Sequence, residues 1–397
     1  EMHKYKLQAV IGAGAFSDLF RAQEIGTGRH VTIKRMKRTY DMERVERLRE
    51  VQASRRLGSH PNIIKLREVL FDRESGRLAL VFERQDGSLC DVICHRQQHL
   101  APEKVLHFMF QLLKGLAHMH KVGIFHRDIK PENIWVVGDA LKLADFGSCR
   151  GVYSKQPFTD YISTRWYRAP ECLLTPGYYN FKMDVWGAGC VFFELMTLYP
   201  LFPGTHEVDQ LHKIHTVLGT PSPALLAKLK TQGHLVSHID VNFPDRRGTG
   251  FLKLLPNVSP VILDLLGKLL AYDPDDRLTA KQALHHPYFD EIKALERFRR
   301  QRPSVPPVEV PTASDPNGRG SMTTAWVEID DVATCRHTQR PLDDAPGRSD
   351  DSVRDLQGSV GMRQPNGTSS SSTDPVDVRG RTTSLPPIGR AHNAAAA

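Results

Sequence analysis

The residues best suited to chemistry form the run His126-Arg127-Asp128-Ile129-Lys130-Pro131-Glu132-Asn133, which is followed further along by Asp145-Phe146-Gly147. Transfer of a phosphoryl group requires little covalent chemistry from a protein and depends on positioning and on neutralising charge. Asp128 can accept the proton of an attacking hydroxyl, and Lys130 can neutralise the transferring group. Asn133 and Asp145 offer the oxygen ligands that Mg²⁺ prefers. We therefore expect both runs to belong to one site.

Upstream residues could bind phosphates. The turn Gly12-Ala13-Gly14-Ala15-Phe16-Ser17 stands between two strand-like runs, where glycines let backbone amides close over phosphates. Taken alone, it is equally consistent with a plain β-hairpin turn. A dinucleotide fold is disfavoured, because the residues after the turn alternate as a strand instead of opening a helix. Lys34 alternates with Val31 and Ile33 on the next strand, so it is expected beneath the turn, with Glu50 as the partner of its ammonium group.

Two kinds of element must position these residues. From Tyr5 to Glu83 short alternating runs are separated by Gly, Pro, Asn and Ser, a pattern that predicts an antiparallel sheet. A helix from about Met42 to Leu57 interrupts it. From Pro102 onward, apolar residues recur at spacings of three and four, which predicts helices over 185–198, 208–218 and 260–270 among others. The fold class is therefore α+β, with a small β lobe before a larger helical lobe.

In this order the motifs resemble those of the eukaryotic protein kinase superfamily over about Tyr5 to Phe289. The resemblance also covers Ala169-Pro170-Glu171, Asp184, Trp186, Gly189 and Arg277. These are scaffold residues in such kinases, where Arg277 would pair with Glu171. It implies the bilobal protein kinase fold, with an N-terminal extension at 1–4, the N-lobe at 5–83, the hinge at 84–88 and the C-lobe at 89–289.

The resemblance further implies ATP and Mg²⁺ as cofactors. The catalytic residues would be Asp128, Lys130, Lys34 and Glu50, and the metal ligands Asn133 and Asp145. The nucleotide would lie against Lys34 and the glycine-rich segment Ile11, Gly12, Ala13, Gly14, Ala15, Phe16, Ser17, Asp18 and Leu19. In the hinge, Phe82 would be the gatekeeper, and the backbones of Glu83 and Gln85 would hydrogen bond to adenine.

Four residues depart from the family pattern. Ser17 replaces the third glycine and Leu19 replaces the usual valine, and we expect both substitutions to be tolerated. Thr32 stands where the family has an alanine against the adenine ring. Its β-branched hydroxyl side chain would crowd or repolarise that contact, so we expect weaker ATP affinity. Arg84 is an unusually charged hinge residue.

The catalytic loop and the segment before Ala169 indicate the type of kinase. Lys130 after Asp128 resembles the serine/threonine version. Thr159-Asp160-Tyr161 resembles the dual-phosphorylation loop of the CMGC group, which holds the mitogen-activated and cyclin-dependent kinases. Each phosphate would add roughly two negative charges, which order a loop only where cations await them. We expect a phosphothreonine to contact Arg127 and a phosphotyrosine to contact Arg165 and Arg168. The alternative is an exposed loop that is never modified.

Within that group, the runs 147–150, 153–157 and 161–174 resemble the MOK kinase branch, which is related to the male germ cell-associated kinases. This resemblance implies a link to the length control of cilia or flagella. It also implies protein substrates phosphorylated on Ser or Thr, with proline following the phosphorylated residue. Activation would come from an upstream kinase or from autophosphorylation. We expect a monomer located in the cytoplasm, with the cilium, flagellum or nucleus as further locations.

Composition limits the other options. The chain of 397 residues has 53 Lys plus Arg against 45 Asp plus Glu, a formal charge of +8 that favours acidic or phosphate-bearing partners, and we expect no specific nucleic acid. The six cysteines are expected to be reduced thiols, and Cys90 with Cys94 lacks a second pair at metal spacing. The apolar run Gly187 to Phe202 contains Glu194 and is too short for a membrane span. After about Arg300 the polar composition predicts a disordered tail, so 290–397 is expected to be mostly disordered.

Two other functions stay open from the sequence. A pseudokinase scaffold would bind nucleotide or partners without transferring phosphate, but the five residues required for catalysis are intact: Lys34, Glu50, Asp128, Asn133 and Asp145. A regulatory adaptor would act through the Ser/Thr/Pro/Arg-rich tail, which serves equally well as an autophosphorylation substrate or a spacer. The histidines at 118, 120, 285 and 286 are expected to be structural rather than metal ligands.

Overall fold

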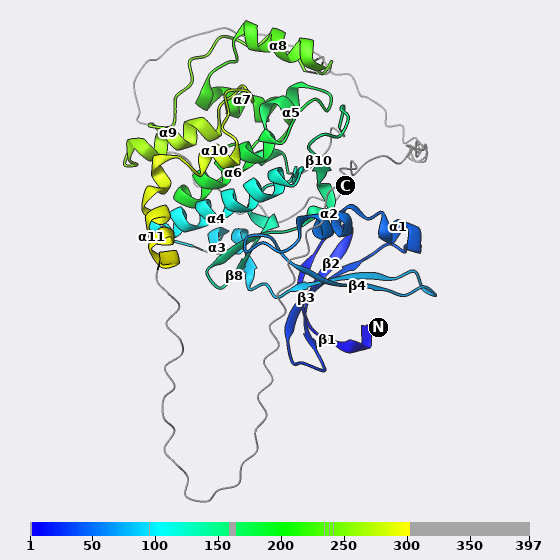
Figure 1. The fold of residues 1–397 in the computed structure, drawn as a ribbon. Helices are drawn as coiled ribbons and strands as arrows, with labels where there is room; N and C mark the ends of the chain where they lie inside the picture. The colour runs from blue at the N-terminus through cyan, green and yellow to red at the C-terminus, as the bar shows by residue number, and fades with distance from the viewer. Residues whose placement is uncertain are drawn as a thin grey trace, which may run out of the picture. The chain divides into compact units, whose positions relative to one another are not determined.

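The computed structural model describes residues 2–301 of the chain, apart from residues 95, 159–163, 234, 238 and 241. It begins with a short 3₁₀ turn and a five-stranded sheet in the order β1-β2-β3-β5-β4, whose neighbouring strands are all antiparallel (Figure 1). The strands are β1 (Tyr5–Ala13), β2 (Ser17–Glu24), β3 (His30–Met36), β4 (Leu66–Phe71) and β5 (Leu78–Glu83). The antiparallel sheet predicted for this region is confirmed.

The two faces of β3 have different roles. Val31 and Ile33 are buried with Val81 of β5 in an apolar cluster on one face. Thr32 and Lys34 alternate with them and pair with Phe82 and Leu80 of β5. Because successive side chains of a strand point to opposite faces, Thr32 and Lys34 lie on the face away from that cluster.

The helix predicted over 42–57 is present as two segments, α1 (Met42–Glu46) and α2 (Arg49–Leu57). Asp41 caps α1 by accepting a hydrogen bond from the backbone N–H of Arg44. Between the segments Leu48 is extended (φ −63°, ψ 120°), and its side chain packs against the core. The buried face of α2 carries Glu50 together with Val51 and Leu57, so the chain places a carboxylate inside an apolar face.

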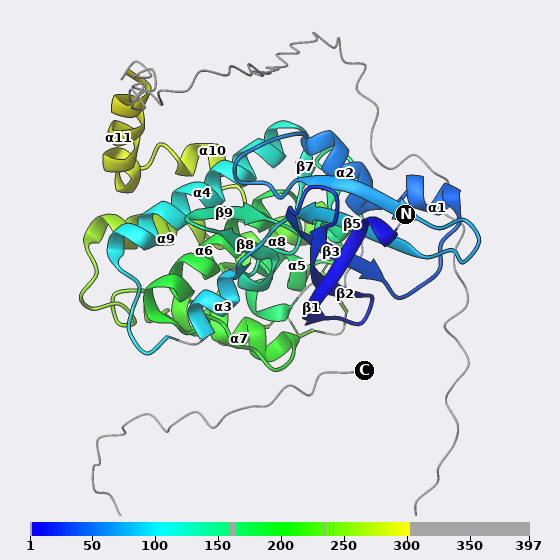
Figure 2. The ribbon, with the colours of Figure 1, turned by 90° about the horizontal axis from the view of Figure 1, so that it is seen from below.

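The second lobe is mainly helical. Its helices are α3 (Leu89–Cys94), α4 (Pro102–Lys121), α5 (Pro170–Leu174), α6 (Lys182–Thr197), α7 (Glu207–Leu218), α8 (Pro223–Gly233), α9 (Pro260–Leu269), α10 (Ala280–Ala283) and α11 (Asp290–Gln301). Helices α4 and α6 lie side by side in both views (Figures 1 and 2). The helices predicted over 185–198, 208–218 and 260–270 are confirmed as α6, α7 and α9. Across the described residues, none of the helices is both long and apolar enough to cross a membrane.

The loops that contain the predicted catalytic residues are flanked by short strands. These strands are β6 (Gly87–Ser88), β7 (Ile124–Phe125), β8 (Ile134–Val137), β9 (Ala140–Leu143) and β10 (Arg150–Gly151). The order β6-β8-β9 forms one small sheet, and β10 pairs with β7. Leu143 donates to the carbonyl of Asn62 (2.9 Å) and accepts from the N–H of Ile64 (2.9 Å), so the segment before β4 is bonded to the strand that leads to Asp145.

Helix α11 occupies the first residues of the predicted tail. It extends from Asp290, and Lys114 of α4 forms an ion pair with Glu296 of α11 at 2.9 Å. Ile292 is buried. This part of the chain therefore packs onto the helical lobe, whereas residues 302–397 of the predicted tail lie outside the described residues.

Candidate active site

The catalytic loop is held from below by α6. Asp184, in the first turn of α6, accepts hydrogen bonds from the backbone N–H groups of His126 and Arg127, both at 2.8 Å, and contacts His120 Nε2 at 2.8 Å. Arg127 has φ +74°, a left-handed conformation that is unfavourable for a residue with a side chain. A Cβ on Gly187 would lie 2.9 Å from the Cβ of Ile129, so only glycine allows α6 to approach the loop this closely. The fold therefore supplies the energy that holds the loop in a strained conformation.

The loop presents a carboxylate with one acceptor oxygen left open. Lys130 Nζ lies 3.2 Å from Asp128 Oδ2 and donates to Thr164 Oγ1 at 3.2 Å. Among the described residues, Asp128 Oδ1 is buried and has no hydrogen-bond partner. Asn133 Nδ2 donates to the backbone carbonyl of Asp128 at 2.9 Å, which fixes the two residues relative to each other. A buried acceptor without a partner is costly unless a ligand supplies the donor.

Lys34 joins the two lobes. Its Nζ lies 2.9 and 2.8 Å from the two carboxylate oxygens of Glu50 on α2, and 2.9 Å from Oδ1 of Asp145, beyond β9. Burial alone would lower the pKa of Lys34, but the carboxylates of Glu50 and Asp145 outweigh it and raise this pKa above its ordinary value. Burial would raise the pKa of Asp145, yet Lys34 holds it below its ordinary value. The lysine is thus a fixed cation, and Asp145 is ionised and able to bind a metal.

The two expected metal ligands lie close together. The backbone N–H of Ala144 donates to the carbonyl of Asn133 at 3.0 Å, so Asp145 follows directly after a residue bonded to Asn133. Asp145 has φ +60°, which turns the chain sharply at this point. Its carboxylate and the amide oxygen of Asn133, whose nitrogen is used by Asp128, are hard oxygen donors of the kind that suit Mg²⁺. The donor set fits a cation that also takes ligands from phosphate and water.

Other side chains that could hold a metal are engaged elsewhere. His118 Nε2 contacts the carbonyl of Leu57, and His286 Nε2 contacts Asp264, both at 2.8 Å. Cys90 and Cys94 lie one helical turn apart on α3, with their sulfur atoms at 3.1 Å. No group of three or more His, Cys, Asp and Glu side chains within the described residues is arranged to hold a metal ion.

The glycine-rich segment forms the turn between β1 and β2. Gly14 N–H donates to the carbonyl of Ser17 at 2.9 Å. On β2, Leu19 pairs with Lys34 of β3, so the turn and the lysine belong to adjacent strands. The turn is therefore a hairpin, and the strand register connects it to the lysine that contacts Asp145.

The hinge differs from the expectation in one detail. The backbone N–H of Gln85 donates to Thr32 Oγ1 at 3.3 Å. Glu83, the other expected adenine contact, accepts from the N–H of Lys65 through Oε1 at 2.9 Å. Arg84 is half exposed and pairs with Asp86 at 2.6 Å. Thr32 thus contacts the hinge through its hydroxyl group.

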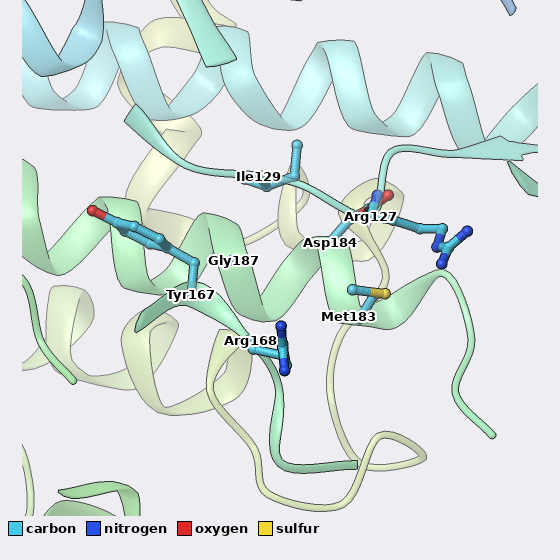
Figure 3. A pocket seen from close by; sticks show the side chains of 7 residues that line it. All are labelled: Arg127, Ile129, Tyr167, Arg168, Met183, Asp184 and Gly187. Carbon is cyan, nitrogen blue, oxygen red and sulfur yellow. Dashed lines mark hydrogen bonds between the residues drawn. The ribbon is translucent and has the colours of Figure 1, made fainter. Parts of the chain in front are cut away.

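The three arginines expected to bind phosphates have partners in the structure. Arg127 Nη2 donates to the hydroxyl of Tyr179 at 2.9 Å. Arg165 donates to the carbonyl of Thr205 at 2.9 Å, and Arg168 lies 3.2 Å from Glu207. Arg127 and Arg168 line one small cavity of about 10 Å³, about the space of a single water. Figure 3 shows that its lining comes from the catalytic loop, the segment before α5 and the start of α6. The expected phosphorylation sites Thr159 and Tyr161 lie outside the described residues.

Two residues that we did not assign from the sequence contribute to the site. Thr164 receives the hydrogen bond from Lys130, so the segment before α5 contacts the catalytic loop directly. Tyr167 donates to Glu194 of α6 at 2.7 Å. Burial raises the pKa of Glu194 to about 7, against the opposing effect of the Tyr167 hydroxyl. The sequence marks Glu194 only as the acidic residue in an otherwise apolar run.

A buried ion pair holds the segment after Tyr167. Arg277 donates to both carboxylate oxygens of Glu171, at 2.7 and 2.9 Å, and both side chains are almost inaccessible to solvent. Its guanidinium group lies over the ring of Trp186, 5.0 Å from the centroid. The pair predicted between Arg277 and Glu171 is therefore present, and it links α5 and α6 to the C-terminal part of the lobe.

Comparisons with known proteins agree with this geometry. The protein kinase domain family matches residues 5–289. The chain is 52% identical over 297 residues to the MAPK/MAK/MRK overlapping kinase of Homo sapiens, covering 75% of this chain and 70% of the relative. It is 53% identical over 296 residues to the Mus musculus protein of the same name, covering 74% and 70%. It is 43% identical over 298 residues to the serine/threonine-protein kinase MAK of Mus musculus, covering 74% and 47%.

The resemblance found in the sequence is thus confirmed, and so are the fold class and the type of enzyme. The family implies ATP and a divalent metal ion at the site described above, and proteins as substrates. The chain belongs to the protein kinase domain family and is a serine/threonine protein kinase of the branch that includes the MAPK/MAK/MRK overlapping kinase and MAK.

Proposed function

We propose that this kinase uses Mg²⁺ to transfer the γ-phosphoryl group of ATP to serine or threonine hydroxyls, and that phosphorylation of Thr159 and Tyr161 activates it. One observation carries the proposal. Lys34 bridges Glu50 and Asp145 at 2.8 to 2.9 Å. This arrangement joins the phosphate-binding strand to the metal-binding loop. The contact between the strand lysine and the helix glutamate is one that active protein kinases require.

Each side chain has a defined task in the transfer. The open Oδ1 of Asp128 would accept the proton of the substrate hydroxyl as its oxygen attacks. Lys130, between Asp128 and Thr164, would neutralise charge on the transferring group. Asn133 and Asp145 would hold Mg²⁺, which when bound neutralises charge on the phosphates. Lys34 would bind the phosphates without having to move away from Glu50.

The arginines support activation by phosphorylation. Arg168 and Arg165 both reach the start of α7, where they contact Glu207 and Thr205, and Arg127 shares a cavity with Arg168. A phosphate with roughly two negative charges forms stronger hydrogen bonds to a guanidinium than a tyrosine hydroxyl does. Phosphates on residues 159 and 161 would therefore compete for these cations and order the loop.

The preference for proline after the phosphorylated residue rests on Arg168. This side chain is buried and lies 3.2 Å from Glu207, so it would stabilise the loop beneath the position of that proline. A role in the length control of cilia or flagella, and a location in the cytoplasm or cilium, rest on the resemblance to this kinase branch.

A peptide-array phosphorylation assay tests the activity and the specificity together. Wild type is expected to phosphorylate Ser and Thr peptides in the presence of Mg²⁺ and to favour those with proline next, whereas Asp128→Asn is inactive. A wild type no more active than Asp128→Asn would instead indicate a scaffold that binds nucleotide without transferring phosphate.

Activation is tested in the same assay with the double variant Thr159→Ala, Tyr161→Phe. We expect its activity to fall at least about tenfold, because the cations would lose their phosphates. Tyr199→Phe, at an exposed tyrosine, is the matched control. Unchanged activity in the double variant, with both sites phosphorylated in the wild type, would contradict the proposed activation.

A further inference from the structure

The hinge of this kinase contains a hydrogen bond that an alanine at position 32 could not form. The backbone N–H of Gln85 donates to Thr32 Oγ1 at 3.3 Å, slightly longer than the usual range of about 2.7 to 3.2 Å for such bonds. Thr32 is 1% exposed and Gln85 7% exposed, so water does not readily replace either partner. The bond lies in the segment where a nucleotide's base is expected to bind.

The strand register explains why the hydroxyl reaches this amide. Thr32 of β3 pairs with Phe82 of β5, and the chain then continues through Glu83 to Gln85. Thr32 shares its face of β3 with Lys34, which contacts Asp145. The hydroxyl and the phosphate-binding lysine therefore lie on the side of the sheet where both ends of a nucleotide would be bound.

We propose that Thr32 determines how the base is recognised, because its hydroxyl accepts the hydrogen bond that Gln85 would otherwise donate to N1 of adenine. This inference rests on the nucleotide site of the proposed function. Adenine presents an acceptor at N1 and a donor at its exocyclic amino group. Because the backbone N–H of Gln85 donates to Thr32, Gln85 contributes little to the binding of adenine at N1. The base is then recognised through its remaining contacts with the protein.

Two explanations of the effect of Thr32, one based on its methyl group and one on its hydroxyl group, predict different outcomes on substitution. If the methyl group crowds the base, Val keeps the defect, whereas Ser and Ala relieve it. If the hydroxyl holds the amide, Ser keeps the effect, whereas Val and Ala remove it. Valine has nearly the same shape as threonine, so Thr32→Val and Thr32→Ser form a matched pair that separates the two causes.

The experiment measures binding by calorimetry, with the full chain and two probes. One probe is ADP and the other is its 1-deaza analogue, in which a C–H group replaces N1. We expect wild type and Thr32→Ser to bind the two probes within about twofold of each other. We expect Thr32→Val and Thr32→Ala to prefer ADP by about fivefold or more, since a hydrogen bond to a buried amide has roughly this effect on affinity. Thermal unfolding without nucleotide checks that every variant is folded.

Three results would overturn the inference. In the first, wild type prefers ADP to the analogue as strongly as Thr32→Val does. In the second, Thr32→Ser prefers ADP as Thr32→Ala does, which assigns the effect to the methyl group. In the third, no folded variant binds ADP at all, which removes the nucleotide site and the proposed function with it.

Discussion

The buried carboxyl group of Glu194, which contacts Tyr167, can be tested through its effect on the free energy of unfolding. The side chain is 7% exposed, lies on α6 and accepts a hydrogen bond from Tyr167 at 2.7 Å. Burial raises its pKa from 4.5 to about 7; the hydroxyl of Tyr167 opposes this rise, and the charge of Glu132 adds to it. The substitution that isolates this titration is Glu194→Gln, since glutamine can still accept the hydrogen bond from Tyr167 but has no proton to lose.

The direction in which pH changes the free energy of unfolding depends on whether the folded or the unfolded chain keeps the proton on Glu194. Between pH 4.5 and about 7 the folded protein keeps a proton on Glu194 that the unfolded chain has lost. Raising the pH through this range therefore favours unfolding. At about 1.4 kcal/mol for each pH unit, the free energy of unfolding falls by about 3 kcal/mol because of this group, and the loss is complete above pH 7. Glu194→Gln lacks this loss.

The assay is urea unfolding of wild type and Glu194→Gln at intervals from pH 4.5 to 8. We expect the free energy of unfolding of the variant, relative to wild type, to increase by about 3 kcal/mol across this range. The control is Glu74→Gln, which replaces an exposed glutamate in the β4–β5 turn. A difference between Glu194→Gln and wild type that stays constant with pH would refute the reasoning, because it would mean that Glu194 is ionised throughout.

Three further predictions concern the charged groups of the site. Lys34→Met should lower kcat/KM for ATP at least about 100-fold in a phosphorylation assay, since it removes the cation at the phosphates. The control Lys37→Met, at a half-exposed lysine, should keep kcat/KM within about twofold of wild type. Equal effects of the two substitutions would contradict the role assigned to Lys34. Asp145→Asn should raise the Mg²⁺ concentration for half-maximal activity at least about tenfold, because it removes a charged ligand, and an unchanged Mg²⁺ titration would exclude it as a ligand. Arg277→Lys should lower the free energy of unfolding in urea by about 3 to 5 kcal/mol, since it disrupts a buried bidentate pair with Glu171; a loss under about 1 kcal/mol would show that the pair is replaceable.

Some parts of the site were predicted from residues that are close together along the chain. Asp128, Lys130 and Asn133 fall within a few positions, and Asn133 fixes part of the loop locally by donating to the backbone carbonyl of Asp128. The alternation of β3 likewise placed Lys34 on the correct face, because a strand has only two faces. Such local rules need no knowledge of the rest of the fold.

The features that the sequence did not predict depend on which side chains the fold brings together. The interruption between α1 and α2 falls where Val45 and Val51 are both buried and Leu48 packs against the same apolar cluster. The bond from Tyr167 to Glu194 joins residues on different elements. The sequence marked Glu194 as the acidic residue in an apolar run, but the residue that donates a hydrogen bond to this buried carboxylate is visible only in three dimensions.

The hydrogen bond from Gln85 changes the interpretation of Thr32, a residue that the sequence analysis had already singled out. From the sequence alone, a β-branched hydroxyl residue in place of alanine predicts weaker ATP binding, because it would crowd or repolarise the contact with the base. The structure adds a bond from Gln85, and the same weaker binding then has a second cause, the loss of a donor. The two causes differ in what a serine would do at this position. Serine restores recognition of the base if the methyl group crowds it, and serine leaves the defect in place if the hydroxyl group holds the amide of Gln85.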